Sequence, residues 1–176
     1  MNYNYNNYKV LLPANVVDWT NTGAGTVGLV WAADVPSLDH SAAANTPVLE
    51  LNIAAAVRKA RALPASTGMK IKSVSVGVII GTAALTSVIA CEGHKLSVST
   101  TTGLVTSATV AITDSIAKAI TTGLLTELTF VDSLGEDSPV EISAYDDLNL
   151  ELTAVCAATS ALKITSLIVD VDILDS

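Results

Sequence analysis

The C-terminal part of the chain carries the clearest pattern of hydrophobic and polar positions. Residues 148–153 alternate leucine with polar residues, and residues 167–173 alternate aliphatic residues with isoleucine and aspartate. Alternation with a period of two predicts β-strands with one apolar face. The short polar stretch 157–160 predicts a turn, so residues 145–173 are expected to form a long antiparallel hairpin. Its apolar face requires a covering sheet, which indicates a sandwich or barrel.

Further strands are predicted by the same alternation along the rest of the chain. They fall at residues 26–32, 48–53, 69–81, 87–99, 106–113 and 124–131. Together with the hairpin this gives about eight strands, and several connections are too long for an up-and-down barrel. The expected fold is therefore all-β: an antiparallel two-sheet sandwich with a single jelly-roll or Greek-key topology.

One short helix is predicted at residues 54–63. Apolar residues recur near helical spacing at Ile53, Val57, Ala60 and Leu63. The basic cluster Arg58, Lys59 and Arg61 lies on another side, where it is expected to be solvated or to form a salt link to a neighbouring subunit. Pro64 ends the helix. The alternative is a strand that continues to Ala56 and ends in a short helical turn.

The N-terminus differs in composition from the remainder. Residues 1–25 are expected to form an arm or extension, and residues 26–176 a single β-sandwich domain. Residues 1–9 are rich in Asn and Tyr and lack both parts of a secretory signal. Because tyrosine provides large contact area at low entropic cost, we expect the arm to dock on a neighbouring subunit; the alternative is a flexible tail. The candidate interface residues are Tyr3, Tyr5, Tyr8 and Trp19.

Composition narrows the range of partners. Only 15% of the residues are charged and 50% are hydrophobic, whereas an average domain carries about 25% charged residues. This balance predicts a homo-oligomer in which apolar surface meets other copies. The net charge of −8 argues against direct nucleic-acid binding, which requires clustered Lys and Arg. No apolar run approaches the ~20 residues of a membrane helix.

Two motifs suggest ligand binding but lack the required context. Cys91 and His94 have C-x-x-H spacing, yet a zinc site needs about four ligands, and in a strand these two residues point to opposite faces. We expect a turn with an exposed His94. Gly23, Gly25 and Gly28 match the dinucleotide pattern G-x-G-x-x-G, but no strand precedes them and no helix follows. They are expected to form a turn that enters a strand.

The remaining reactive residues predict no catalytic, cofactor or metal site, so the chain is not expected to be an enzyme. Asp39, His40 and Ser41 are adjacent and cannot adopt the geometry of a hydrolase triad. Cys91 and Cys156 are expected to be buried thiols, and their pairing stays open. Calcium binding by acidic loops is an alternative to simple solvation. The carboxylates concerned are Asp132, Glu136, Asp137, Glu141, Asp146, Asp147, Asp170, Asp172 and Asp175.

Three strings in the second half of the chain carry a family resemblance. They are KIKSVSV at residues 70–76, GTAAL at 81–85 and LNLELTAVCAATS at 148–160. Over residues 66–174 the chain resembles uncharacterised small β-sandwich virion proteins of bacteriophages and environmental viruses. The N-terminal third departs from that pattern. The resemblance implies a structural role in a virus particle and carries no functional residue across, because the shared motifs are packing patterns.

The function predicted is that of a virion structural protein, made in the host cytoplasm. We expect a phage capsid or capsid-decoration subunit that self-assembles through sheet edges and the N-terminal arm. Its expected partners are copies of itself and other virion proteins, without direct nucleic-acid or membrane binding. The alternatives are a carbohydrate- or surface-binding adhesin module, or an extracellular filament subunit held by donated strands.

Overall fold

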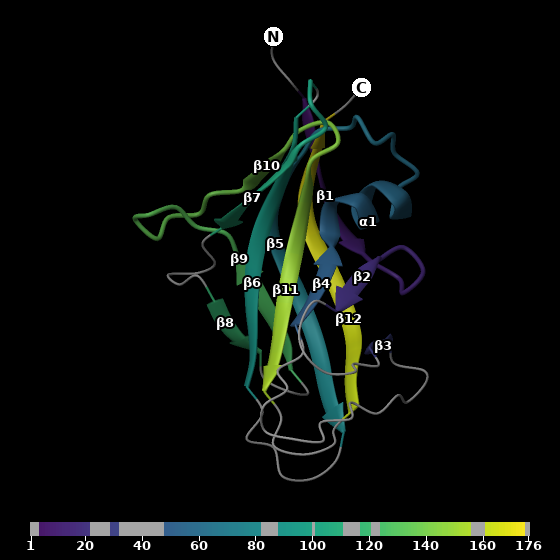
Figure 1. Ribbon diagram of the computed structural model, residues 1–176, viewed down its shortest axis with the longest axis vertical. Coiled ribbons are helices and arrows are strands. Elements are labelled where there is room, and N and C mark those ends of the chain that lie inside the picture. Colours follow the sequence, from purple (N-terminus) through teal and green to yellow (C-terminus); the bar gives the residue numbers. More distant parts are fainter. Residues whose placement is uncertain are drawn as a thin grey trace.

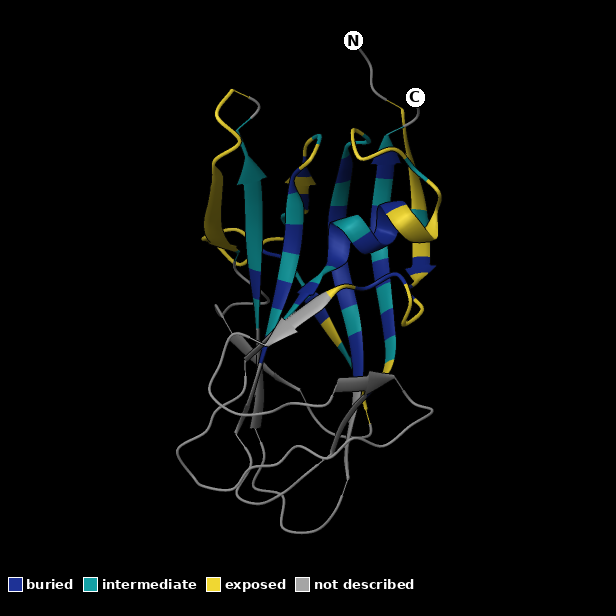
Figure 2. Ribbon diagram, turned by 45° about the vertical axis from the view of Figure 1, so that its right-hand side comes forward, coloured by how far each residue is buried: buried dark blue, intermediate teal, exposed yellow. Residues whose placement is uncertain are grey.

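Two six-stranded β-sheets enclose the hydrophobic core of the protein. The computed structural model in Figure 1 describes residues 4–21, 29–31, 48–81, 88–99, 101–110, 117–120, 124–155 and 161–174. Buried side chains of both sheets and of one short helix belong to a single core cluster. Figure 2 shows this burial as dark blue bands that alternate with teal along the strands. The predicted all-β, two-sheet sandwich is confirmed.

The first sheet contains the two termini of the described chain. Its central strands are antiparallel, and β3 runs parallel to β12. The order is β1 (Tyr5–Leu11), β12 (Ala161–Leu174), β5 (Met69–Gly81) and β10 (Val140–Ile142), with β3 (Leu29–Trp31) on β12 and β9 (Leu125–Thr129) on β5.

The second sheet is antiparallel at every described pair. Its order is β2 (Trp19–Asn21), β4 (Val48–Asn52), β11 (Asp147–Val155), β6 (Val88–Val98) and β7 (Val105–Val110), with β8 (Ala117–Ile120) also on β6. Across both sheets early strands pair with late ones: β1 with β12, β4 with β11, β5 with β9, and β6 with β7. This nesting is the connectivity of a jelly roll.

The predicted hairpin at residues 145–173 is wrong in its pairing. Its two strands, β11 and β12, lie in different sheets. Their apolar faces were correctly predicted, since Leu150 of β11 and Val169 of β12 are both fully buried. Alternation determines which face of a strand is buried but does not name the neighbouring strand. The two apolar faces therefore cover the same core from opposite sides.

The N-terminal segment also differs from the expected arm. Residues Tyr5–Leu11 form β1, which pairs along β12 of the same chain, and Trp19 lies in β2 opposite Leu51. Both segments therefore belong to the sheets of the sandwich, and the boundary expected at residue 25 lies outside the described residues. The polar composition is compatible with an edge strand, because its backbone bonds to β12 while the Asn7 amide donates to Asp170 (2.8 Å) and Asp172 (2.9 Å).

The candidate interface tyrosines make contacts within their own chain. Tyr8 packs against the core, and the Arg61 guanidinium lies 4.3 Å from the centre of its ring. Tyr5 is 38% exposed, with the Lys70 Nζ 5.0 Å from its ring centre. Tyr3 lies outside the described residues. Docking of these tyrosines on a neighbouring subunit stays a prediction.

The predicted helix is present as α1 (Ile53–Ala60), but one of its basic residues is not solvated. The Arg58 side chain is buried. Its guanidinium donates to the carbonyl oxygens of Asp146 (2.8 Å), Ser143 (2.9 Å) and Thr67 (3.1 Å). Helical spacing places Arg58 near the apolar face, and the surrounding loops supply acceptors that satisfy its donors. Lys59 and Arg61 are exposed, as expected.

The start of α1 is fixed to the second sheet by Asp147 at the beginning of β11. The Asp147 carboxylate accepts the backbone N–H groups of Ala54 (2.9 Å) and Ala55 (3.1 Å). These N–H groups belong to the first helical turn and have no partner within the helix. Burial raises the pKa of Asp147, although the N–H donors and nearby Arg58 oppose this effect.

Because of that raised pKa, Asp147→Asn is expected to become more favourable relative to the wild type as the pH rises. The folded wild type holds the Asp147 proton more tightly than the unfolded chain, so this carboxyl loses stabilising effect as the pH rises above its ordinary pKa of 3.8. Asparagine keeps an acceptor oxygen and does not ionise. Urea unfolding from pH 3 upward measures the free energy of unfolding of both proteins. We expect the value for Asp147→Asn minus the value for the wild type to rise with pH, and a fall with pH contradicts the prediction.

Candidate functional site

Polar side chains cross three neighbouring strands on the outer face of the second sheet. Glu92 and His94 lie two residues apart on β6 and therefore on the same face. The register places Glu151 of β11 opposite Glu92, and Asn149 opposite His94. On the other side of β11, Glu50 of β4 lies opposite Glu151. Alternate residues of the same strands, including Leu150 and Leu152, face the core and are fully buried.

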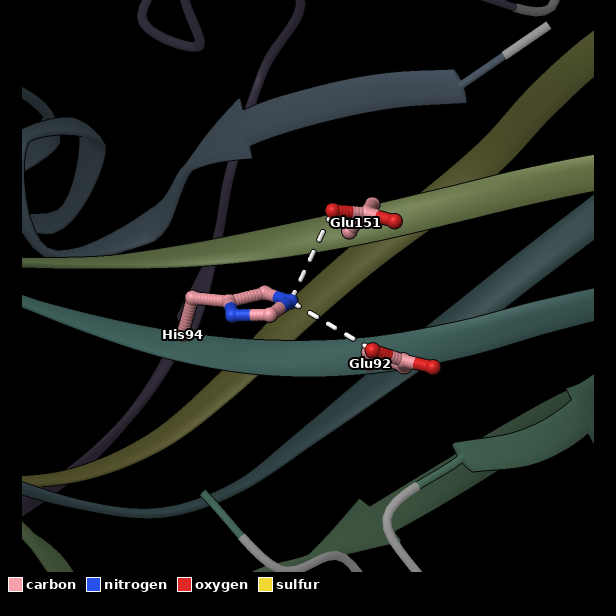
Figure 3. A group of neighbouring side chains, drawn as sticks. All are labelled: Glu92, His94 and Glu151. Carbon is pink, nitrogen blue, oxygen red and sulfur yellow. Dashed lines mark ion pairs between the residues drawn. The ribbon is translucent and has the colours of Figure 1, made fainter. Parts of the chain in front are cut away.

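Glu92, His94 and Glu151 form a compact group, referred to below as the Glu–His–Glu cluster. The His94 Nε2 lies 3.5 Å from a carboxylate oxygen of Glu92 and 3.5 Å from one of Glu151 (Figure 3). One potential ligand atom from each residue lies within 4.8 Å of the others. The three side chains are half-buried, so the cluster is partly shielded and still open to solvent.

The electrostatics of the cluster are unbalanced. Glu151 has a glutamate opposite it on each neighbouring strand, and like charges directly across a sheet repel each other. The His94 Nε2 is buried and has no hydrogen-bond partner, and the same holds for the Asn149 Oδ1. Buried polar atoms are normally paired. A cation held between the two carboxylates would reduce the repulsion between them and could also bond to the unpaired His94 Nε2.

The sequence-based expectation for His94 is wrong. His94 lies within the continuous strand β6 and is half-buried, not exposed in a turn. The preceding Gly93 continues the strand, pairing with Leu150 and Val110. The spacing of Glu92 and His94 was available in the sequence as E-x-H on a strand. Glu151 was not, because its position beside them depends on the β11–β6 register.

Several of the acidic residues considered for calcium have other partners. Asp172 pairs with Lys72 at 2.9 Å, and Asp170 lies 4.0 Å from Lys9. Burial acts to raise the pKa of Asp172, but hydrogen bonds from Lys72 and Asn7 outweigh it, and the pKa lies below its usual value.

The acidic loop after β9 is organised by its own backbone. Asp132 accepts the N–H groups of Leu134 (2.8 Å) and Glu136 (3.1 Å), which makes its carboxylate the centre of the turn. Asp175, His40, Cys156 and the three glycines of the G-x-G-x-x-G pattern lie outside the described residues. The burial of Cys91 is likewise undescribed.

A second feature lies at the edge of the same sheet. Strand β7 pairs with β6 on one side and ends the order of described strands on the other. Every residue from 101 to 109 is exposed, and none of them is charged. Leu104 is 64% exposed and Val105 55%. No described strand pairs with the outer side of β7, so among the described strands this edge is free and carries the exposed side chain of Val105. His94 lies on the neighbouring strand β6, opposite Thr109 of β7.

None of the helices in the described part of the chain is both long and apolar enough to cross a membrane.

Comparison with known proteins assigns no family. No family model matches the chain, and no curated protein matches it either. Two solved structures show a distant likeness. One contains the CBM22-1 and GH10 modules of an endo-1,4-beta-D-xylanase from Clostridium thermocellum complexed with xylohexaose, with 12% identity and a TM-score of 0.39. The other is from infectious bursal disease virus, Gx strain, with 11% identity and a TM-score of 0.28.

Both alignments span nearly all of this chain but less than half of the other chain. The alignments span 100% and 97% of this chain, but only 29% of the xylanase chain and 42% of the viral chain. With TM-scores this low, neither structure bears on what the protein does.

Proposed function

We propose that the protein is a structural subunit of a virus particle, a capsid or capsid-decoration protein, that associates with further copies of itself through the exposed edge of its second sheet. The observation that carries the self-association is the uncharged strand β7, whose residues 105–109 are all exposed. The resemblance of residues 66–174 to phage virion proteins supports the placement in a virus particle.

Strand β7 lacks the features that protect free edges in monomeric proteins. Such edges commonly carry Lys, Pro, inward-pointing charges or a bulge, because an unpaired edge is a template for another strand. The sequence of β7, VTSATV, contains no charged residue and no proline. Its pairing with β6 runs from Val105 to Val110 without a register shift. A strand from a second copy can therefore add to it by main-chain hydrogen bonds.

Further apolar surface lies on the other sheet. Leu124 and Leu125, at the start of β9, are 61% and 55% exposed. Clustered exposed leucines on a chain with few charges are typical of surfaces that are covered by a partner. When such contacts are heterologous, identical subunits form a closed ring if the rotation closes and a filament if it does not.

The test is to introduce a charge on the edge. Val105→Lys is expected to weaken self-association by about tenfold or more, since placing an ammonium group at a strand–strand contact costs over about 1.4 kcal/mol. Sedimentation velocity across a range of concentrations measures the shift. The matched control is Leu134→Lys, because Leu134 is 83% exposed and lies in the loop between β9 and β10, which belong to the other sheet.

Three results would count against the proposal. A wild-type protein that stays monomeric at every concentration and salt excludes self-assembly. Equal effects of Val105→Lys and Leu134→Lys exclude the β7 edge as the contact. Negative-stain electron microscopy of the assembled wild type distinguishes closed shells from open helical polymers, and the latter would indicate the filament subunit instead.

A further inference from the structure

We propose that the Glu–His–Glu cluster of Glu92, His94 and Glu151 is a binding site for a divalent transition-metal ion of the zinc class. This inference is independent of the proposed role in assembly. It rests on the donor atoms, their spacing and the unbalanced charge of this part of the sheet.

The spacing of the donor atoms matches a common central ion. Zinc bonds to imidazole nitrogen and carboxylate oxygen are about 2.1 Å long, so two ligands of a tetrahedral ion lie about 3.4 Å apart. The His94 Nε2 is 3.5 Å from an oxygen of each glutamate. In Figure 3 both carboxylates approach this nitrogen from different strands. A small movement of the side chains places an ion between the three groups.

Two unpaired atoms point independently to a missing partner. The His94 Nε2 is buried without a hydrogen bond, although it carries the lone pair or proton that faces the glutamates. The Asn149 Oδ1, at the register position opposite His94, is buried without a partner as well. A bound cation gives the imidazole nitrogen a ligand bond and offers a water molecule for neighbouring polar atoms.

The row of glutamates adds an electrostatic reason. Glu50, Glu151 and Glu92 occupy adjacent positions on β4, β11 and β6. Glu151 therefore faces a glutamate on each neighbouring strand, and like charges directly opposite each other destabilise a sheet unless a cation lies nearby. A divalent ion between Glu92 and Glu151 neutralises both carboxylates, and the half-exposed side chains leave a path for its entry.

The donor set favours zinc over calcium or magnesium. Calcium takes six to eight oxygen ligands, and magnesium prefers carboxylates with several waters. Imidazole nitrogen suits zinc, copper, nickel and iron. One nitrogen and two carboxylate oxygens form a three-residue set that leaves a fourth tetrahedral position for water.

Titration of the full-length protein with ZnCl₂ by isothermal calorimetry tests the site. We expect one ion per chain and no saturable binding of CaCl₂. His94→Gln and Glu151→Gln each remove a ligand with little change in shape, and each is expected to weaken zinc binding by more than about tenfold. The controls are Glu136→Gln, in the exposed loop after β9, and His40→Gln, at the only other histidine. Both are expected to bind zinc like the wild type.

The outcomes separate this site from its main rival, in which a protonated His94 simply bridges the two glutamates. Absence of saturable zinc binding, or binding unchanged in His94→Gln, overturns the proposal. Tighter binding of calcium than of zinc also overturns it. Circular dichroism confirms that each variant is folded. Val105→Lys is expected to retain zinc binding, so failure of the assembly proposal and failure of the metal site give different results.

Discussion

Replacing Arg58 with alanine is expected to lower the free energy of unfolding by about 3–5 kcal/mol, the range for removing one partner of a buried charged network. The guanidinium is buried and holds three carbonyl oxygens, from Thr67, Ser143 and Asp146. Its loss leaves those acceptors without their donor. It also removes the positive charge near the buried carboxylate of Asp147.

Arg58 owes its importance to the segments that it joins. It lies on α1, whereas its acceptors lie in the loops before β5 and before β11, so one side chain connects the helix to both sheets. Burial lowers the pKa of Arg58, while the carboxylates of Asp147 and Asp146 act to raise it. Arginine remains protonated in proteins, and the buried charge therefore depends on these acceptors in the folded state.

Chemical unfolding in urea measures this effect. The matched control is Lys59→Ala, one residue further along α1, where the exposed side chain is expected to contribute within about 0.5 kcal/mol. Arg58→Lys should be intermediate, because one ammonium group cannot reach all three acceptors. A loss below about 1 kcal/mol in Arg58→Ala would show that water replaces the guanidinium without cost.

Replacing Phe130 with alanine is expected to cost about 3–5 kcal/mol as well, through a cavity in the core. Phe130 is the only phenylalanine of the chain and is fully buried. Its backbone N–H donates to the carbonyl oxygen of Lys72 (3.2 Å), and its carbonyl oxygen accepts the backbone N–H of Ser138 (2.8 Å). The backbone is thus held on both sides, which limits how far the surrounding residues can move to fill the space.

The control for Phe130→Ala is Leu134→Ala, four residues later. Leu134 is 83% exposed, so its truncation is expected to change the free energy of unfolding by less than about 0.5 kcal/mol. Phe130→Leu retains part of the buried volume and should lose less than the alanine variant. Similar losses for Phe130→Ala and Leu134→Ala would contradict the central position of Phe130 in the core.

The two structural predictions and the proposed sites concern different parts of the molecule. Arg58 and Phe130 are expected to stabilise the scaffold, whereas the Glu–His–Glu cluster lies on the outer face of the second sheet and β7 lies at its edge. A substitution of Arg58 or Phe130 should therefore mainly change the free energy of unfolding. A substitution at either surface site should mainly change zinc affinity or self-association.

Much of the fold was predictable because burial follows a period of two. Leu148 and Leu167 lie on the predicted apolar faces and are fully buried, and α1 begins and ends close to its expected bounds. Short polar strands were missed. The N-terminal strand Tyr5–Leu11 has an exposed outer row and few apolar residues, and its pairing with β12 supplies backbone hydrogen bonds that composition does not reveal.

The candidate site was less predictable than the fold. The spacing of Glu92 and His94 was present in the sequence, but the third member, Glu151, is 57 positions beyond His94 in the printed sequence and comes beside them only through the β11–β6 register. Arg58 was similarly misjudged, because the carbonyl groups that bury it belong to loops far from α1 in sequence. Local pattern contains no information on such partners.

The sequence by itself determined which residues alternate between core and surface, where helix α1 lies, and that the chain carries few charged residues. Side-chain period and composition are local properties, so they can be read without a partner strand. Only the tertiary structure decided that β11 and β12 belong to opposite sheets, that β1 joins β12, and that three ligand-type side chains meet on one face. Strand register and sheet order arise from contacts between distant segments, and those contacts create both the free edge and the cluster.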